Sequence, residues 1–347
     1  MLISFTMCIA EEQRIHYSKS FYSPFWILPI AALLTACDFA GYESYGGSTM
    51  GTYYRVVADC QKTLSLSKIT EALSSVDEEM SNYRIDSTVQ QFNRSPTESW
   101  FGVDESLVHV VSVAYDVSRL SSGRFDISIE PLVSAWGFGA TKVSSRPSNE
   151  TIETLLKQVD YRALEFRSSP PGLRKKRPLT IDLSGIAKGY GVDVLAELLD
   201  QSDCDNYLVE IGGELRVKGV NQANRAWKIG IENPSGGGVQ TKILMPRGSL
   251  ATTGDYRNYR VFDGESYPHV LDATTGYPVD HNVASVTVHM PTATEADAIA
   301  TALFVLGEEG LELATAHDIA ALFLTWNEET QRFVQETTPK MKLLLDD

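Results

Sequence analysis

The sequence has little cysteine and no excess of basic charge, and these two shortages exclude several classes of protein. Its 347 residues include 4 cysteines, Cys8, Cys37, Cys60 and Cys204, and none forms a CxxC motif or a Cys/His spacing typical of zinc sites. The formal net charge of −15 argues against a nucleic-acid partner, because phosphate binding requires clustered Lys and Arg. The one short basic run, Arg174–Arg177, lies among Ser, Pro and Gly residues and is interpreted as a solvated loop.

The N-terminus also lacks an apolar run long enough to span a bilayer. The stretch Phe25–Ala36 is too short for a stable transmembrane helix, and Arg14 and Lys19 precede it. A basic segment followed by a short apolar segment is typical of a signal peptide. The segment before Arg14 is long for such a signal, so the true start could be Met7 or a later residue.

The apolar stretch ends in Leu34–Cys37, which resembles a bacterial lipobox, where the Cys thiol accepts diacylglycerol. We therefore predict a lipoprotein signal peptide at residues 1–36, lipidation at Cys37 and a tether at residues 37–47. The two or three acyl chains of such a lipoprotein anchor stably to a membrane. Asp38 after the cysteine indicates the inner membrane, with the protein facing the periplasm. The alternative is an ordinary cleaved signal with a chance cysteine.

The remaining chain has the composition of a folded protein, with 43% hydrophobic and 22% charged residues. Leu66, Ile69, Leu73, Val76 and Met80 follow helical spacing, and a second helix is expected from an N-cap at Asp104 to Leu120. Cys60 and Cys204 could form a disulfide in an oxidising compartment or remain two buried thiols.

Short β-rich runs follow the helices, and several are joined by turns rather than helices. These runs are Leu179–Leu183, Tyr207–Ile211, Leu215–Val220, Trp227–Glu232, Val239–Leu244 and Ser285–His289, after a first run at Thr52–Ala58. Turns between neighbouring strands indicate antiparallel pairing. We therefore predict an α+β fold, with mixed, largely antiparallel sheets and packed helices, in one domain at residues 48–340.

Asp297 and Thr301 are the first candidates for chemistry. They lie four residues apart in a segment whose start has the capping-box spacing of Thr292 and Glu295, so a helix would place both oxygens on one face. A carboxylate and a hydroxyl suit Mg²⁺, which prefers oxygen and few protein ligands. Taken alone, the same pair could be an ordinary helix surface feature.

A Gly-rich turn and a histidine are two further candidates. The segment Asp182–Gly191 runs from a strand-like sequence into a turn and a helix, where backbone N–H groups can face an anion. It matches neither a P-loop nor GxGxxG. His269, in the segment Tyr267–Asp272, is compatible with a general base, because histidine ordinarily has a near-neutral pKa; a structural histidine at a strand end is the alternative.

The chain resembles the FAD:protein FMN transferase (ApbE) family from Ser48 to about Leu324. The matching blocks are Gly47–Thr52, Met80–Tyr83, Gly123–Asp126, Pro131–Val133 with Trp136–Gly139, Asp182–Gly189, Gly212–Glu214, His269–Asp272 and Ala296–Ala302. One departure is Ala273, where the family usually has Pro after the Asp. This difference should alter loop rigidity rather than chemistry, because Pro contributes a fixed φ and no reactive group.

The resemblance implies an ApbE-like fold and a set of site residues. The implied FAD contacts are Met50, Tyr83, Arg124, Phe125, Asp126, Asp182, Lys188 and Leu271. The implied metal ligands are Asp297, Thr301 and the carbonyl of Gly185. His269 is our candidate catalytic base. Asp272 is our second catalytic candidate, as the carboxylate that orients it, and the alternative is a carboxylate that forms the turn.

The implied reaction is a magnesium-dependent transfer of FMN from FAD to a Thr or Ser hydroxyl of an acceptor protein. A phosphoester forms and AMP leaves, with charge developing on the pyrophosphate oxygens. The expected acceptors are periplasm-facing subunits of redox proteins. Two alternatives remain, namely a magnesium-dependent FAD pyrophosphatase, in which water replaces the acceptor, and a non-catalytic FAD-binding lipoprotein.

Overall fold

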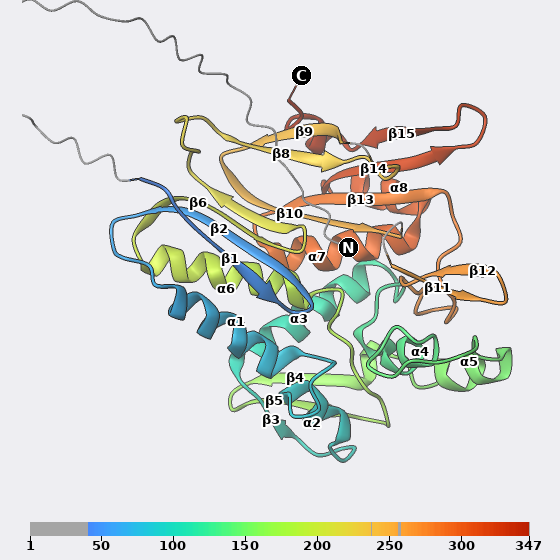
Figure 1. Cartoon of the computed structure of the whole chain (residues 1–347). Helices are drawn as coiled ribbons and strands as arrows, with labels where there is room; N and C mark the ends of the chain where they lie inside the picture. The colour runs from blue at the N-terminus through green and yellow to red at the C-terminus, as the bar shows by residue number, and fades with distance from the viewer. Residues whose placement is uncertain (1–40, 237, 256–257, 347) are drawn as a thin grey trace, which may run out of the picture. The chain divides into compact units, whose positions relative to one another are not determined.

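A computed structural model describes residues 41–236, 238–255 and 258–346 (Figure 1). The predicted signal peptide at residues 1–36 and the predicted lipidation site Cys37 lie outside these residues. In the described ranges, no helix has both the length and the apolar character needed to cross a membrane.

The centre of the fold is an eight-stranded sheet. Its strands in spatial order are β1 (Glu43–Thr49), β2 (Thr52–Cys60), β6 (Cys204–Ile211), β7 (Glu214–Lys218), β10 (Arg247–Gly254), β13 (Val283–Met290), β14 (Ala320–Asn327) and β15 (Arg332–Thr337). Every neighbouring pair runs antiparallel. The predicted α+β class with largely antiparallel pairing is therefore confirmed.

Helices and three small sheets surround this sheet (Figure 1). The helices are α1 (Leu66–Met80), α2 (Thr88–Arg94), α3 (Glu105–Leu120), α4 (Glu130–Ala135), α5 (Asn149–Leu156), α6 (Ala187–Gln201), α7 (Ala293–Leu306), α8 (Glu308–Ala316) and α9 (Pro339–Lys342), with 3₁₀ turns η1 (Ile127–Ile129) and η2 (Tyr161–Ala163). The small sheets are β3 (Phe101–Gly102), β5 (Pro171–Lys175) and β4 (Leu164–Ser168); β8 (Trp227–Glu232) and β9 (Val239–Met245); and β11 (Tyr259–Phe262) and β12 (Glu265–Pro268).

Both faces of the central sheet are covered. On β2, Val56 packs with α1 and α6, whereas Val57 packs on the opposite face with Trp227 of β8. On β14, Phe323 and Leu322 likewise enter different clusters. A strand buried on both faces needs apolar residues at successive positions, which explains why these strands show little alternation.

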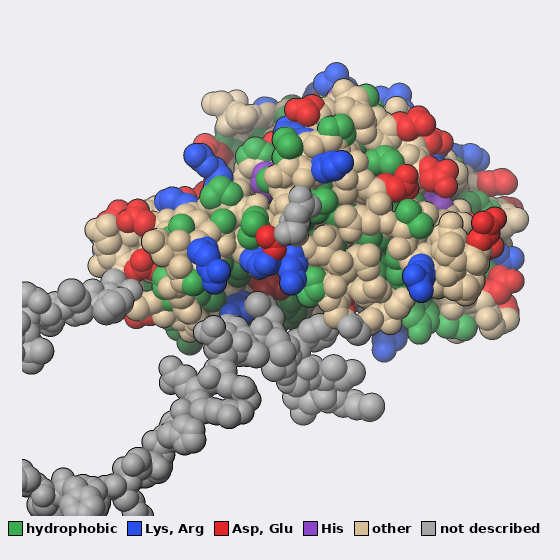
Figure 2. All heavy atoms as spheres, turned by 90° about the horizontal axis from the view of Figure 1, so that it is seen from above, with side chains coloured by type: hydrophobic (Ala, Val, Ile, Leu, Met, Phe, Trp, Pro, Cys, Tyr) green, Lys and Arg blue, Asp and Glu red, His purple; other side chains and the backbone are tan. Residues whose placement is uncertain are grey.

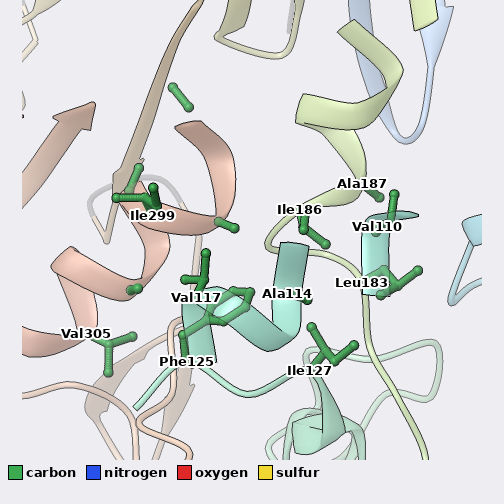
Figure 3. Close-up of a cluster of buried hydrophobic side chains, with 14 of the residues drawn as sticks. Val110, Ala114, Val117, Phe125, Ile127, Leu183, Ile186, Ala187, Ile299 and Val305 are labelled. Carbon is green, nitrogen blue, oxygen red and sulfur yellow. The ribbon is translucent and has the colours of Figure 1, made fainter. Parts of the chain in front are cut away.

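The largest hydrophobic cluster lies between α3, α7 and the segment that leads into α6. Figure 3 shows Val110, Ala114 and Val117 of α3 beside side chains from this segment and from α7. Two of these, Leu183 and Ile186, are fully buried immediately before α6 begins. The start of α6 is therefore held by core packing on its inner side.

The strand predicted at Leu179–Leu183 is not a strand. Most of its residues are buried, but the backbone at Ile181 hydrogen-bonds to side chains instead of to a neighbouring strand. The Ile181 carbonyl accepts from Asn82 Nδ2 at 3.0 Å and from Asn93 Nδ2 at 2.9 Å, and the Ile181 N–H donates to Asn93 Oδ1. Two asparagine amides thus satisfy backbone groups that a sheet would otherwise pair.

Three further expectations need correction. The predicted tether ends too late, because Glu43–Thr49 forms β1 and pairs with β2, so the fold begins before residue 48. The folded domain also extends past its predicted end at residue 340, because Leu345 forms a β-bridge with Ile243. The basic run is not a solvated loop either, because β4 and β5 form a hairpin in which Lys175 is buried.

The two cysteines left open by the sequence form a disulfide. Cys60 and Cys204 are paired residues of the adjacent strands β2 and β6, and their sulfurs are bonded across 144 positions of sequence. Such bonds persist in oxidising environments. Elsewhere on the described surface, acidic and basic side chains lie intermingled on the face seen in Figure 2.

Candidate active site

The candidate site is organised by the crossing of α6 and α7. Gly189, in the first turn of α6, lies so close to α7 that a Cβ there would be 2.2 Å from the Ala293 carbonyl oxygen and 2.8 Å from Asp297 Cβ. The Gly189 N–H donates to Asp297 Oδ2 at 2.9 Å. Only glycine allows this approach without moving one of the helices.

The two helices also cap each other. Asp193 of α6 accepts hydrogen bonds from the N–H groups of Ala293 and Thr294, at 3.0 and 2.8 Å, where α7 begins. Asp297 of α7 in turn accepts the Gly189 N–H at the start of α6. Carboxylates at helix N-termini satisfy free N–H groups and interact favourably with the helix dipole. Each helix therefore fixes the other's first turn.

The predicted metal ligands lie at this crossing. Asp297 is 2% exposed, which excludes the alternative that it is an ordinary surface residue of a helix. Thr301 follows one turn later, and its Oγ1 lies 3.1 Å from Thr253 Oγ1. A Cβ on Gly185 would lie 3.5 Å from Thr301 Oγ1, so the Gly185 backbone and the Thr301 hydroxyl are adjacent.

The oxygens at this place fit magnesium better than a softer metal. Over the described ranges, no group of three or more His, Cys, Asp or Glu could hold an ion. A carboxylate, a hydroxyl and a backbone carbonyl would instead supply a small set of hard oxygen ligands. Mg²⁺ commonly binds through one or two carboxylates and completes its octahedron with water and substrate phosphate.

Two buried carboxylates and one partly exposed ammonium lie together at this place, and we call them the Lys188 cluster. Lys188 Nζ lies 3.1 Å from Glu214 Oε1 and 3.7 Å from Asp297 Oδ1. Burial raises the pKa of Glu214 above its ordinary value, although the Lys188 ammonium beside it opposes this shift. Burial lowers the pKa of Lys188, but the charges of Asp297 and Glu214 outweigh that effect and raise it above its ordinary value.

His269 lies near this cluster, at the end of β12. Its Nδ1 is 3.1 Å from the Asn258 carbonyl oxygen. Its ring packs edge to face with Phe138, with 6.4 Å between the ring centroids. Because a carbonyl can only accept, Nδ1 carries the proton and Nε2 of the neutral ring keeps its lone pair. Burial lowers the His269 pKa, and the nearby Lys188 charge lowers it further.

Comparison with known proteins places this geometry in a family. The model of the ApbE family matches residues 50–323. The chain belongs to the ApbE family. It is 37% identical to the FAD:protein FMN transferase of Vibrio cholerae over 86% of this chain and 93% of that protein. It is 34% identical to the FAD:protein FMN transferase of Escherichia coli K12, over 86% and 88%.

Solved structures agree with this assignment. The flavin transferase ApbE from Vibrio cholerae has a TM-score of 0.80 at 35% identity, covering 88% of this chain and 100% of that one. The ApbE protein of Thermotoga maritima has a TM-score of 0.79 at 31% identity, over 88% and 100%. The predicted family and the ApbE-like fold are confirmed, and the named relatives are transferases.

The expected FAD contacts of this ApbE chain fall into separate groups. Arg124 pairs with Asp272 at 2.8 Å, which joins two of the sequence blocks, and Phe125 is buried beside Gly185. Leu271 is buried within the same block as Asp272. Asp126 has a structural role as well, because Oδ1 accepts the Ser128 N–H and Oδ2 the Tyr161 N–H.

Tyr83 and Asp182 form a second group. Asn82, next to Tyr83, hydrogen-bonds to the residues on either side of Asp182, so the two expected contacts are held near each other. Partial burial and, after it, the Asp182 charge raise the pKa of the Tyr83 hydroxyl, which donates to the Phe138 carbonyl at 3.2 Å. Burial raises the pKa of Asp182, even though its carboxylate accepts the Ser184 N–H.

Met50 lies at a different edge of α6. It occupies the tight turn between β1 and β2 with φ of 46°. It borders a pocket of about 350 Å³ between that turn and α1. A Cβ on Gly191 would lie 3.3 Å from Met50 Sδ, so Met50 touches the second turn of α6.

Asp272 does not contact the histidine it was expected to orient. Its carboxylate accepts from Arg124, from the Thr274 N–H at 2.8 Å and from the Thr274 hydroxyl at 2.6 Å, and no bond to His269 is found among the described residues. The Asn258 carbonyl is the group at His269 Nδ1 instead. Sequence reasoning missed Asn258 because a backbone carbonyl leaves no signature in a side-chain pattern.

The helix crossing gives a test by substitution. Gly189→Ala should lower the free energy of unfolding by about 1–3 kcal/mol, since the added methyl group would overpack against backbone atoms of α7. Gly191→Ala is the matched control, because its Cβ would meet only the side-chain ends of Ile211 and Met50 at 3.1 and 3.3 Å. Both changes gain the same helix propensity, about 1 kcal/mol. Urea unfolding that shows equal stability for the two variants would contradict the packing argument.

Proposed function

We propose that the chain is a magnesium-dependent FAD:protein FMN transferase that forms a phosphoester with a Thr or Ser of an acceptor protein and releases AMP. The observation that carries this proposal is the meeting of Asp297, Thr301 and Lys188 at the α6–α7 crossing, with His269 nearby. It joins hard oxygens, a positive charge paired with two buried carboxylates and a candidate base in a chain of the ApbE family.

The proposed chemistry uses each group in turn. The acceptor hydroxyl oxygen attacks the FMN phosphorus, the bond from that phosphorus to the bridging pyrophosphate oxygen breaks, and AMP leaves with that oxygen. His269 Nε2 takes the hydroxyl proton. Magnesium, held by Asp297, Thr301 and the Gly185 carbonyl, would supply charge neutralisation for the pyrophosphate. Lys188 adds a positive charge that is already fixed before the reaction begins.

We propose that the FAD contacts are the residues expected from the sequence, arranged around this crossing. Tyr83 is 64% exposed, so its ring face is available to stack on a flat aromatic ligand. The Arg124–Asp272 pair links the loop after α3 to the loop before β13 and would close one side of the site.

The metal proposal predicts a graded response to substitution. Asp297→Ala should abolish FMN transfer, because a charged oxygen ligand is lost where phosphate charge must be neutralised. Thr301→Ala should weaken transfer less, because water can replace a neutral ligand. Transfer is measured by in-gel flavin fluorescence of an acceptor protein over a range of Mg²⁺ concentrations. Wild-type transfer by Asp297→Ala at low Mg²⁺ would exclude this site.

The same assay separates transferase from pyrophosphatase. Mass analysis of the products with and without acceptor distinguishes FMN bound to protein from free FMN. Free FMN at equal yield in both samples would favour water as the nucleophile.

The base proposal predicts a pH dependence. A base must be neutral to accept a proton, and the lowered pKa of His269 keeps it neutral to a lower pH than an ordinary histidine. The acid limb of kcat should therefore have its midpoint below 6.5, the ordinary histidine value. His269→Ala should lose this limb and turn over about 10²–10⁴-fold more slowly, while still binding FAD.

A purely structural histidine would behave differently. Its removal would lower stability and FAD affinity together and leave turnover at saturation nearly intact. Single-turnover transfer at saturating FAD and acceptor, with a thermal melt of each variant, separates the two roles. Asp272→Asn serves as a comparison, and we expect it to act mainly through the Arg124 pair and the turn at Thr274.

We propose further that the protein is a lipoprotein of the bacterial inner membrane, facing the periplasm, with periplasm-facing redox subunits as acceptors. The lipobox at Leu34–Cys37 and Asp38 supports this location, and the Cys60–Cys204 disulfide agrees with an oxidising compartment.

The location has its own test. Wild type should partition with inner membranes, and Cys37→Ser should lose the lipid and remain an unprocessed precursor. Mass spectrometry of the mature N-terminus and membrane fractionation measure both outcomes. A soluble wild-type protein whose mature N-terminus is not Cys37 would contradict the proposal.

A further inference from the structure

Glu214 is a buried carboxylate to which the reaction proposed above assigns no role. It begins β7 directly after a turn in which Gly212 and Gly213 have φ of 60° and 113°. This turn from β6 to β7 brings the glutamate under the first turn of α6, where it is 4% exposed. One oxygen, Oε1, pairs with Lys188, and the buried Oε2 has no hydrogen-bond partner among the described residues.

The placement of Lys188 between two carboxylates is uneven. Its Nζ lies 3.1 Å from Glu214 Oε1 but 3.7 Å from Asp297 Oδ1. The ammonium therefore pairs with both carboxylates but lies closer to Glu214 than to Asp297. The other Asp297 oxygen is occupied by the Gly189 N–H, so Oδ1 is the atom left for a cation.

We propose that Glu214 is a positioning residue that holds the Lys188 ammonium away from Asp297 Oδ1 and so keeps that oxygen available to the metal ion. This inference rests on the proposed magnesium site at Asp297 and Thr301. It gives the Gly212–Glu214 block a function in metal affinity rather than in FAD contact.

The physical reason is competition between two cations for one carboxylate oxygen. With Glu214 ionised beside the ammonium, the Lys188 cluster contains two carboxylates and one ammonium, so one negative charge remains for a metal ion. If Glu214 lost its charge, Asp297 would be the remaining counter-ion of Lys188 within the cluster. The attraction between buried charges is strong at short range, and the ammonium would move onto Asp297 and oppose metal binding.

The test is a double-mutant cycle read out by metal binding alone. Mg²⁺ is titrated by calorimetry, without FAD, into wild type, Glu214→Gln, Lys188→Met and the Glu214→Gln/Lys188→Met double variant. Glu214→Gln should bind Mg²⁺ about tenfold more weakly, the usual size of an effect on a metal ligand through its neighbour. The double variant should recover the affinity of Lys188→Met, because the competing ammonium is gone.

A merely structural glutamate would not give that recovery, because removing Lys188 would leave the packing defect in place. Wild-type affinity in Glu214→Gln, or an unrecovered loss in the double variant, would overturn the proposal. If Glu214→Gln does not fold, Glu214→Asp keeps the charge and should bind Mg²⁺ like wild type, and a tenfold loss there would also overturn it.

Asp297→Ala separates this inference from the function on which it rests. If wild type binds Mg²⁺ and Asp297→Ala does not, the metal site is supported, and the double-mutant cycle then tests the role of Glu214 alone. If Asp297→Ala binds as tightly as wild type, the metal site and the role of Glu214 both fall.

Discussion

The close contact between α6 and α7 at Gly189 is the constraint on which the candidate site depends. Because Gly189 has no side chain, its N–H reaches Asp297 Oδ2 at 2.9 Å, and Asp193 reaches the first N–H groups of α7. A carboxylate of each helix therefore accepts hydrogen bonds from free N–H groups in the first turn of the other helix. The same contact places Lys188 beside Asp297, the proposed metal ligand.

Burial of the two carboxylates strengthens the electrostatic interactions at this contact. Asp297 and Glu214 are almost fully buried, so their charges are poorly screened and strongly coupled to Lys188. An unpaired buried carboxylate is costly, and the cluster holds one more carboxylate than ammonium. In the proposed function, a metal ion would balance this excess negative charge.

Asparagine side chains and one ion pair between loops position the other segments around the site. Asn82 and Asn93 replace a neighbouring strand for the segment around Asp182, which lets that segment turn into α6 instead of joining a sheet. Arg124 and Asp272 join the loop after α3 to the loop before β13. These contacts connect positions far apart in the sequence, and each is made by one or two polar atoms.

The sequence by itself determined the antiparallel α+β class, the helix containing Asp297 and Thr301, and the family, because periodicity, capping and ordered motifs are local properties of the chain. It did not determine that residues 179–183 are not a strand, that Cys60 and Cys204 are bonded, or that His269 is oriented by Asn258 instead of Asp272. It also gave no role to Glu214. These features depend on which groups, distant in the sequence, meet in the folded protein. Only the tertiary structure decides that, because packing and desolvation act between segments whose local sequences do not specify their partners.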